Sequence, residues 1–462
     1  MMEFCFIHKH IMTYNFLINS SRFKILRALM HVFFSGIGGT GIGPIAQIAL
    51  KAGYQVSGSD KRDSEYIKYL KSHGIDKIVF DQTEQSIAEV HQNNPIDWFV
   101  YTSALTMEND NPPEIEFCRK NNIKFSKRDA FLSEFLKLKN LKLIAIAGTH
   151  GKTTTTAMTV WLFKRLGIPV SYVLPAKTNF AQMGDYDEKS QYFVYEADEF
   201  DRNFLAFRPH LSIITGVSWD HHEIYLTQQD YIDAFKDFIG KSEETLVLKP
   251  DADFMTLGLS NNIKVLDHND DLIKQIGIPG LYNRRDAYLA LKAIKQLGLE
   301  NDTPLLVKTL IDFPGLSRRM EEITPNLYSD YAHTPEKITA ALNVAKELID
   351  INGNKQRLIV IYEPLTNRRQ HYIKHKYKQL FNQVDKLYWI PSYLAREDNN
   401  QPILSPLELI SELDKSDLAQ AAELNSALKE NIVNHLNNND LVVAISGGGG
   451  NSLDEWLRAN FL

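Results

Sequence analysis

The feature that most constrains this chain is the segment 148–154, which reads Gly-Thr-His-Gly-Lys-Thr-Thr. An apolar run precedes the segment, and a helix-like stretch that ends near Leu166 follows it. A strand, a glycine-rich turn and a helix start predict a phosphate-binding loop, in which backbone N–H groups and Lys152 contact phosphate oxygens and Thr153 holds Mg²⁺. The full pattern has a glycine where Ile146 stands, so an ordinary strand-to-helix turn stays an alternative.

Size and composition describe an ordinary globular chain. The 462 residues are enough for about three domains, and 44% hydrophobic with 23% charged residues allow a large core. The net charge of −6 argues against a general nucleic-acid binder. The two cysteines, Cys5 and Cys118, are too few for a disulfide framework or a cysteine-based zinc site, which favours a cytoplasmic location.

No apolar run approaches the roughly 20 residues that a membrane-spanning helix needs, so membrane insertion is not expected. The first residues do not form a clean signal-peptide pattern. Met30 stands directly before the first clear strand. We therefore interpret 1–29 as a doubtful N-terminal extension, either an artefact of the assigned start or a disordered tail.

From residue 30 onward, strand-like apolar runs alternate with helix-like amphipathic runs, which is the pattern of parallel sheets in α/β domains. Breaks near 137–140 and 312–315 divide the chain into three blocks. We predict three α/β domains, at 30–138, 139–312 and 313–462.

The first block carries a dinucleotide-type fingerprint. Gly36, Gly38 and Gly41 follow an apolar strand in the spacing Gly-x-Gly-x-x-Gly, and Asp60 ends the next strand. Such a turn brings the backbone close to a pyrophosphate, and the acidic residue binds a ribose. Alone it would suggest an NAD-dependent dehydrogenase, but any nucleotide diphosphate fits the turn, and a purely structural turn is the remaining alternative.

Two polar clusters follow predicted strands of the second block. Residues 196–201 read Glu-Ala-Asp-Glu-Phe-Asp, and residues 219–223 read Trp-Asp-His-His-Glu. Because the carboxyl ends of parallel strands line one crevice, both clusters should lie beside the 148–154 loop. A carboxylate and an imidazole there can hold Mg²⁺ together with phosphate oxygens. Taken singly, each cluster is read more simply as a solvated surface turn.

The third block opens with Arg318 and Arg319, which either neutralise phosphate or form a solvated surface pair. Thr334 and Pro335 fit the N-cap and the first turn of a helix, so His333 should directly precede one. Near the end, a strand leads into Ser-Gly-Gly-Gly-Gly-Asn at 446–451. This segment predicts either a second anion-binding turn or a flexible loop.

In this order, over about residues 30–458, the motifs resemble the Mur ligases, the ATP-dependent amide-forming enzymes of peptidoglycan precursor synthesis. The resemblance is carried by residues 36–41, 58–60, 148–154, 196–199, 220–221, 283, 318–319 and 330–333. It implies a Rossmann-like domain that binds a UDP substrate at 30–138, a central P-loop ATP-binding α/β domain at 139–312 and a Rossmann-like α/β ligase domain at 313–462. It also implies ATP and Mg²⁺ as cofactors. It also implies a reaction in which ATP converts a muramate carboxylate into an acyl phosphate, which an amine then captures to form an amide.

The resemblance assigns roles to individual residues. The catalytic residues would be Lys152, Glu196, His221, His333 and Arg319, and Mg²⁺ would be held by Thr153, Glu196 and His221. ATP would bind Gly148, Thr149, His150, Gly151, Lys152, Thr153, Thr154, Asn283, Arg318 and Asp330. The UDP part of the substrate would bind Gly36, Gly38, Gly39, Gly41, Ser59 and Asp60.

His150 and the 36–41 loop look like the branch that acts on UDP-N-acetylmuramate, with L-alanine as the expected amine. Phe200 and the segment 362–367 look more like members that attach a recycled tripeptide, so a peptide amine stays an alternative. Asp286 stands where Asn is usual in the family. A nucleotide-binding oxidoreductase is the more remote alternative. We expect a monomer or homodimer without a nucleic-acid partner.

Overall fold

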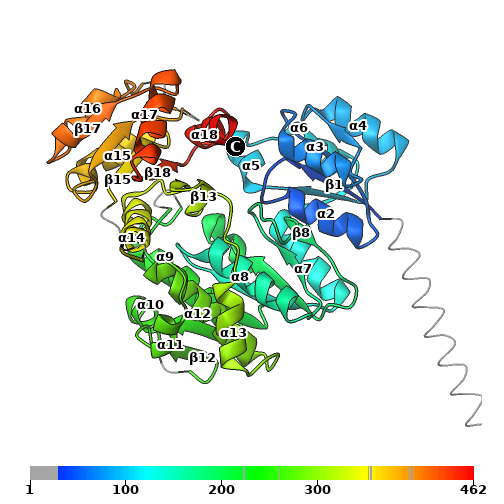
Figure 1. The fold of residues 1–462 in the computed structure, drawn as a ribbon. Coiled ribbons are helices and arrows are strands. Elements are labelled where there is room, and N and C mark those ends of the chain that lie inside the picture. The colour runs from blue at the N-terminus through cyan, green and yellow to red at the C-terminus, as the bar shows by residue number, and fades with distance from the viewer. Residues whose placement is uncertain are drawn as a thin grey trace, which may run out of the picture. The chain divides into compact units, whose positions relative to one another are not determined.

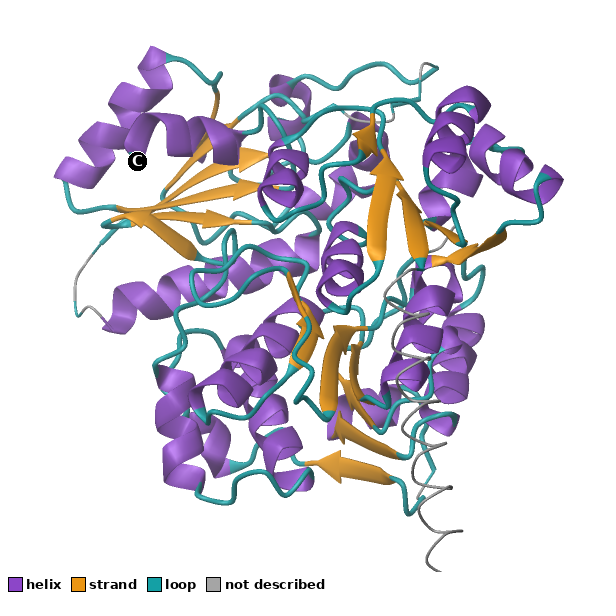
Figure 2. Ribbon diagram, turned by 90° about the vertical axis from the view of Figure 1, so that its right-hand side faces the viewer, coloured by secondary structure: helices purple, strands orange, loops and turns teal. Residues whose placement is uncertain are grey.

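The computed structural model describes residues 30–221, 224–258, 260–351, 353, 356–394, 397–398 and 400–462. The predicted extension 1–29 and two residues of the second polar cluster, His222 and Glu223, lie outside these residues. The described chain forms three sheets, most of whose strands are parallel, which confirms the predicted α/β class. Figures 1 and 2 show helices packed around the strands.

The N-terminal sheet has the strand order β3-β2-β1-β4-β5, and all its pairs are parallel. This is the order of a Rossmann-type half, in which ligands bind at the carboxyl ends of the strands. The strands are β1 (His31–Ser35), β2 (Gln55–Ser59), β3 (Ile78–Val79), β4 (Trp98–Tyr101) and β5 (Lys124–Lys127). The helices are α2 (Gly43–Lys51), α3 (Glu65–Ser72), α4 (Glu84–Asn93), α5 (Ser103–Glu108), α6 (Pro113–Lys120) and α7 (Arg128–Lys139).

Alternation along β1 explains why this sheet has helices on both faces. Val32 and Phe34 pack in one buried cluster, together with Ile45 of α2. Phe33 points the other way and packs with Ile87 of α4. Successive strand residues face opposite sides, so an entirely apolar strand must be covered twice.

The central sheet has the order β12-β11-β10-β6-β9-β7-β8 and is parallel except at the β7–β8 pair. This order puts β6 between β9 and β10, so the segments that follow these three strands begin at one edge. The strands are β6 (Lys142–Ala147), β7 (Ser171–Val173), β8 (Gly184–Asp185), β9 (Tyr192–Glu196), β10 (Leu211–Ile214), β11 (Glu244–Leu248) and β12 (Ile263–Leu266). The helices are α8 (Lys152–Arg165), η1 (Phe200–Ala206), α9 (Gln228–Gly240), α10 (Lys249–Phe254), α11 (Asp271–Gln275), α12 (Leu281–Gln296) and α13 (Thr303–Ile311).

The C-terminal sheet has the order β13-β14-β18-β15-β16-β17, in which only the β13–β14 pair is antiparallel. The strands are β13 (Glu321–Thr324), β14 (Leu327–Asp330), β15 (Leu358–Glu363), β16 (Lys386–Trp389), β17 (Ala419–Ala421) and β18 (Leu441–Ser446). The helices are α14 (Pro335–Ile351), α15 (Asn367–Ile373), η2 (Lys374–Tyr377), α16 (Pro406–Ile410), η3 (Ser416–Leu418), α17 (Ser426–Asn437) and α18 (Leu453–Phe461).

The domain boundaries predicted at 138/139 and 312/313 stay predictions. The first lies inside the last turn of α7, which ends where Asn140 adopts a left-handed conformation. By contact density, the chain forms two compact units. One contains the described residues up to 176 with 181–270 and 289–309, and the other contains 177–180, 271–288 and 310–462.

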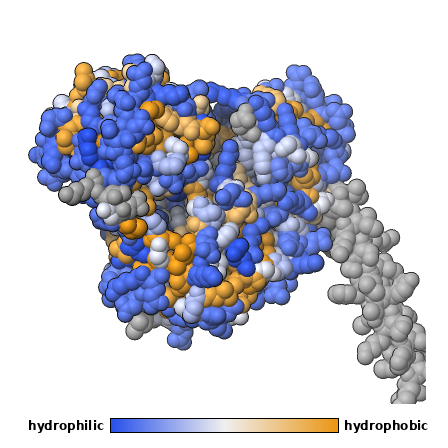
Figure 3. Space-filling model, in the orientation of Figure 1, coloured by the Kyte–Doolittle hydropathy of each residue, from blue (hydrophilic) through white to orange (hydrophobic). Residues whose placement is uncertain are grey.

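Among the described residues, no helix combines the length and the apolar composition that crossing a membrane requires. The face drawn in Figure 3 is mostly hydrophilic, with separate apolar patches.

Candidate active site

The 148–154 segment is a sharply bent loop between β6 and α8. Gly148 and Gly151 have positive φ angles of 148° and 78°, a region that favours glycine. A Cβ on Gly148 would lie 2.3 Å from Oγ1 of Thr215, so the loop also lacks space for a side chain there. The backbone N–H groups of Thr149 and His150 both donate to the carbonyl of Gly216, at 2.8 and 3.0 Å. The segment that follows β10 therefore fixes the first half of the loop.

Lys152, the first residue of α8, lies in an ion pair with Glu199. Its Nζ donates to the two carboxylate oxygens at 2.8 and 3.0 Å and to the carbonyl of Gly148 at 2.5 Å. Burial opposes the charge on Lys152, but Glu199 and Glu196 outweigh it and raise the pKa of the lysine. Burial likewise opposes the charge on Glu199, and Lys152 lowers its pKa. Both shifts favour the charged forms of the pair, in which Glu199 is 1% and Lys152 14% exposed.

Thr153 and Glu196 form the second contact across this edge. The Thr153 hydroxyl donates to the Glu196 carboxylate at 2.8 Å. These are hard oxygen donors, which suit Mg²⁺. Among the described residues, no group of three or more His, Cys, Asp or Glu side chains is placed to hold a metal ion. Thr154 follows in the first turn of α8.

The two predicted histidines of this edge have protein partners. His221, at a φ of 54°, places its Nε2 3.6 Å from Glu199. Burial lowers the pKa of His221, but the contact with Glu199 and the charge of Asp220 raise it overall. His150 contacts the Ser218 hydroxyl through Nε2 at 3.0 Å. The structure thus brings Lys152, Thr153, Glu196 and His221 together, as the sequence predicted.

The N-terminal loop 36–41 is held by the strand beside it. The carbonyl of Ser59 accepts from the N–H groups of Gly36 and Ile37, at 2.8 and 3.0 Å. Asp60, predicted to bind a ribose, accepts from the N–H of Gly38 at 2.8 Å through one oxygen. Gly39 donates to the carbonyl of Gly36. In this structure Asp60 therefore fixes the loop, and ribose binding stays a prediction.

The predicted residues of 283–333 lie in the second compact unit. Asn283 donates from Nδ2 to the carbonyl of Pro279 at 2.9 Å. Asp330 ends β14 and accepts from the backbone N–H groups of Met320 and Ala332, at 2.9 and 2.8 Å. His333 contacts the carbonyl of Tyr331 through Nδ1, and burial together with Lys337 lowers its pKa to about 3. His333 is therefore a neutral imidazole at physiological pH.

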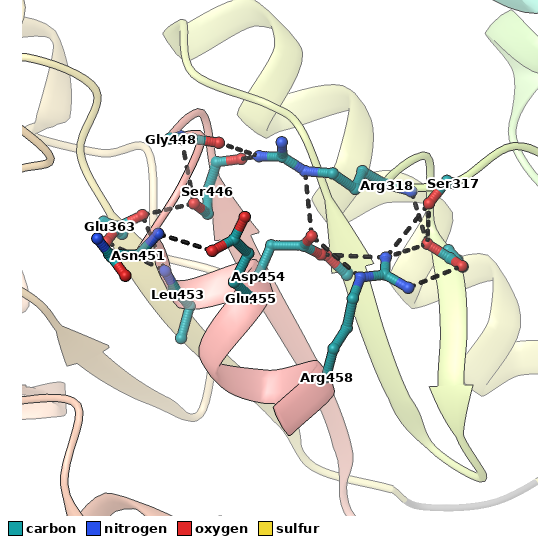
Figure 4. A network of polar contacts seen from close by, with 12 residues as sticks. Ser317, Arg318, Glu363, Ser446, Gly448, Asn451, Leu453, Asp454, Glu455 and Arg458 are labelled. Atoms are coloured by element: carbon teal, nitrogen blue, oxygen red, sulfur yellow. Dashed lines mark hydrogen bonds and ion pairs between the residues drawn. The ribbon is translucent and has the colours of Figure 1, made fainter. Parts of the chain in front are cut away.

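The adjacent arginines differ in their surroundings. The guanidinium of Arg318 donates to the carbonyls of Ser446 and Gly448, both at 2.7 Å, and lies 3.6 Å from Asp454 (Figure 4). Arg319 lies over the ring of Tyr331. Arg318 is thus a structural link to the glycine-rich segment that follows β18, and its contact with ATP stays a prediction.

The glycine-rich segment 446–451 is closed by carboxylates of the chain itself. Glu363, which is 4% exposed, accepts from the Ser446 hydroxyl at 2.5 Å and from the N–H of Leu453 at 3.2 Å. The N–H of Asn451 donates to Glu455 at 2.7 Å (Figure 4). Protein carboxylates thus accept hydrogen bonds at both ends of this segment, and anion binding by the glycines between them stays a prediction.

The sequence analysis assigned no role to two residues near the 148–154 and 36–41 loops, Glu199 and Arg128. Glu199 was part of the acidic motif, but only Glu196 was given a role. Arg128 carried no motif at all, yet its guanidinium lies beside Gly41 and 3.3 Å from Asp198. The alternation of carboxylates in 196–201 was a usable signal for Glu199, whereas Arg128 is placed by tertiary packing alone.

Comparison with known proteins agrees with this geometry. A model of the Mur ligase family catalytic domain matches residues 31–140, and a model of the Mur ligase middle domain matches residues 146–271. Together the two models match more than half of the chain.

Two relatives align with this chain over nearly their whole length. The chain is 28% identical to a UDP-N-acetylmuramate–L-alanine ligase of Clostridium acetobutylicum over 90% of this chain and 95% of the relative. It is also 28% identical to the ligase of that name from Rickettsia felis, over 94% and 98%.

Solved structures give the same fold. The UDP-N-acetylmuramate–alanine ligase of Thermotoga maritima superposes with a TM-score of 0.70 at 22% identity, covering 94% of this chain and 98% of that chain. A murein peptide ligase of Psychrobacter arcticus superposes with a TM-score of 0.59 at 23% identity, covering 93% and 98%. The chain therefore belongs to the Mur ligase family of ATP-dependent ligases, as the sequence motifs predicted.

Proposed function

We propose that this protein joins L-alanine to UDP-N-acetylmuramate at the expense of ATP, with Mg²⁺ as cofactor. The observation that carries the proposal is the pair of contacts Lys152–Glu199 and Thr153–Glu196 at the carboxyl edge of the central sheet. A lysine and a hydroxyl at a glycine-rich strand-to-helix turn are the groups that a nucleoside triphosphate needs. The relatives named above support the substrate and the amine.

The reaction proceeds in two displacements. An oxygen of the muramate carboxylate attacks the γ-phosphorus of ATP, and the bond to the bridging oxygen breaks to release ADP. The neutral amine then attacks the acyl phosphate carbon, loses a proton and expels phosphate. When bound, Mg²⁺ neutralises charge on the phosphoryl oxygens, and Thr153 and Glu196 would hold it. Proximity can supply up to about 7–11 kcal/mol of barrier reduction in such a site.

Lys152 has a defined task in this scheme. Its Nζ is charged and lies at the amino end of α8, where a phosphate is also favoured by the helix. When phosphate arrives, it competes with Glu199 for the three donors of the ammonium group. Because Glu199 is 1% exposed, the ammonium is held in place before ATP binds. Such a preorganised charge lowers the barrier without reorganisation during the reaction.

A peptide amine is the second candidate. Phe200 packs edge-on against His221, with ring centroids 5.2 Å apart, so an aromatic side chain stands beside the acidic cluster. The segment 362–367, which runs from the end of β15 to the start of α15, is the second such feature. Both features look more like the murein peptide ligases, one of which has the same fold.

Phosphate release tests the proposal. Purified protein is mixed with ATP, Mg²⁺ and UDP-N-acetylmuramate, and L-alanine or a tripeptide is added in separate reactions. We expect release that requires the nucleotide sugar and L-alanine together. Release only with the tripeptide would move the assignment to the peptide amine. If neither L-alanine nor the tripeptide supports phosphate release, ligation is contradicted. A change in NAD(H) fluorescence without phosphate release would also contradict it.

A further inference from the structure

The acidic loop, residues 196–201, divides its carboxylates between two partners. Glu196 and Glu199 contact Thr153 and Lys152 of the predicted phosphate-binding loop 148–154, called the phosphate loop below. Asp198 and Asp201 face the other way, toward the N-terminal sheet. One short loop therefore touches both the predicted ATP site and the part of the chain that carries the predicted UDP site.

The partners on the second side are consecutive residues. Lys127 ends β5 and forms an ion pair with Asp201, whose carboxylate also accepts from the Ser103 hydroxyl at 2.6 Å. Arg128 begins α7 and contacts Asp198 through Nη2 at 3.3 Å. Burial opposes the charge of Arg128, but the neighbouring carboxylates, Asp129 first among them, raise its pKa. Carboxylates of the acidic loop therefore hold both side chains.

The acidic loop needs external support because its backbone is strained. Asp201 has φ and ψ angles of 52° and 26°, and Arg202 has 55° and 25°. The left-handed region costs a residue with a side chain about 1–2 kcal/mol. Two such residues in succession persist only where contacts hold them, and Lys127 and Ser103 provide these contacts for Asp201.

Arg128 also occupies the space above the N-terminal glycine loop. A Cβ on Gly41 would lie 1.9 Å from its Nη1, so a side chain at position 41 would require the guanidinium to shift. The third glycine of the fingerprint and Arg128 thus lie in direct proximity. A ligand that binds the 36–41 loop meets the same side chain that holds Asp198.

We propose that Arg128 is a positioning residue that couples occupancy of the 36–41 loop to the geometry of the phosphate loop, through Asp198 and the acidic loop. An anionic pyrophosphate near Gly41 accepts a hydrogen bond from Nη1 of Arg128, while Nη2 of the same guanidinium keeps its contact with Asp198. The position of Asp198 sets that of Glu196 and Glu199, and hence of Thr153 and Lys152. The inference rests on the proposed function for the identity of its two ligands.

Calorimetry on the full chain tests this coupling without turnover. The dissociation constant of a non-hydrolysable ATP analogue is measured with Mg²⁺, with and without saturating UDP-N-acetylmuramate. Coupling between two sites typically changes affinity by about 5–150-fold. We expect a change of at least about fivefold in the native protein, and its reduction to less than about twofold in Arg128→Gln. Arg128→Lys keeps the positive charge but lacks the two guanidinium nitrogens that contact two partners at once, so it should retain part of the coupling.

Controls separate coupling from a general structural effect. Arg119→Gln removes an exposed arginine of α6 that is paired with Glu116, and it should leave the coupling unchanged. If Arg128→Gln does not fold, Arg128→Lys and Lys127→Gln carry the test, and both should reduce the coupling. Absence of coupling in the native protein, or full coupling in variants that fold, would overturn the inference. Failure of the proposed function is seen separately, as native protein that binds UDP-N-acetylmuramate but releases no phosphate with any amine.

Discussion

Glu114 gives the sharpest test of the electrostatics of this fold. It lies on α6 and is 1% exposed. Its two oxygens accept from the hydroxyls of Ser35 and Ser59, each at 2.5 Å, so it joins the carboxyl ends of β1 and β2. Burial raises the pKa of Glu114 to about 7, although the two serines lower it. Asp81 adds to the rise.

The sign of the pH dependence follows from this pKa. Below the ordinary value of 4.5, the carboxyl group is protonated in the folded and unfolded chain alike. Between 4.5 and about 7, only the folded chain keeps the proton, so the free energy of unfolding falls as pH rises. Well above pH 7, the ionised and buried Glu114 lowers the free energy of unfolding by about 3 kcal/mol, which corresponds to the difference between the two pKa values.

Glu114→Gln removes this titration and keeps the shape of the side chain. Relative to the native protein, the variant should gain about 2 kcal/mol between about pH 5.5 and about pH 8.5. Hydrogen exchange of the β1 and β2 amides measures the opening free energy locally, which avoids treating a multidomain chain as two-state. Glu116→Gln, on the same helix and half-exposed, is the control for net charge. The reasoning would be refuted if the difference in opening free energy between Glu114→Gln and the native protein did not change with pH. It would also be refuted if the native protein became the more stable of the two as pH rises.

Further predictions concern the phosphate loop. Lys152→Ala should lower kcat by on the order of 10²-fold or more, the loss expected for one preorganised charge donor, and near-normal turnover would remove Lys152 from its role. Glu199→Gln should leave Lys152 without its buried counter-ion and destabilise the protein by about 3–5 kcal/mol, which thermal denaturation with the control Glu243→Gln would show. Gly148→Ala should abolish ATP-analogue binding, because its Cβ would meet Thr215, and calorimetric binding equal to that of the native protein would contradict this. Chelation of Mg²⁺ by EDTA should stop phosphate release and readdition should restore it, whereas release that persists in EDTA would exclude the metal.

The sequence predicted much of the fold because several of its central strands, such as β6 and β18, are mostly apolar. A run such as 141–147 must be buried on both faces, and glycines that follow it mark the loop at its carboxyl end. The phosphate loop, the acidic loop and His221 were predicted together for this reason.

What the sequence did not predict depends on contacts between distant segments. Arg128 acquires its meaning from Gly41 and Asp198, which lie 87 and 70 positions away in the chain. The contacts of Glu363 with Ser446 and Leu453, at the two ends of the glycine-rich turn, also join segments far apart in the chain. A local pattern can identify a loop, but it cannot give the distant side chains that surround the loop.

The position of β18 bears on how the chain matures during synthesis. It is the last strand to be made, yet it pairs with β14 on one side and β15 on the other. Until it emerges, these two strands lack their shared neighbour and expose unpaired edges, which favour aggregation. The earlier sheets can form before this moment, because none of their strands comes from beyond residue 266. A nascent chain that stalls shortly before residue 441 would thus carry two complete sheets and a third whose strands β14 and β15 have unpaired, aggregation-prone edges.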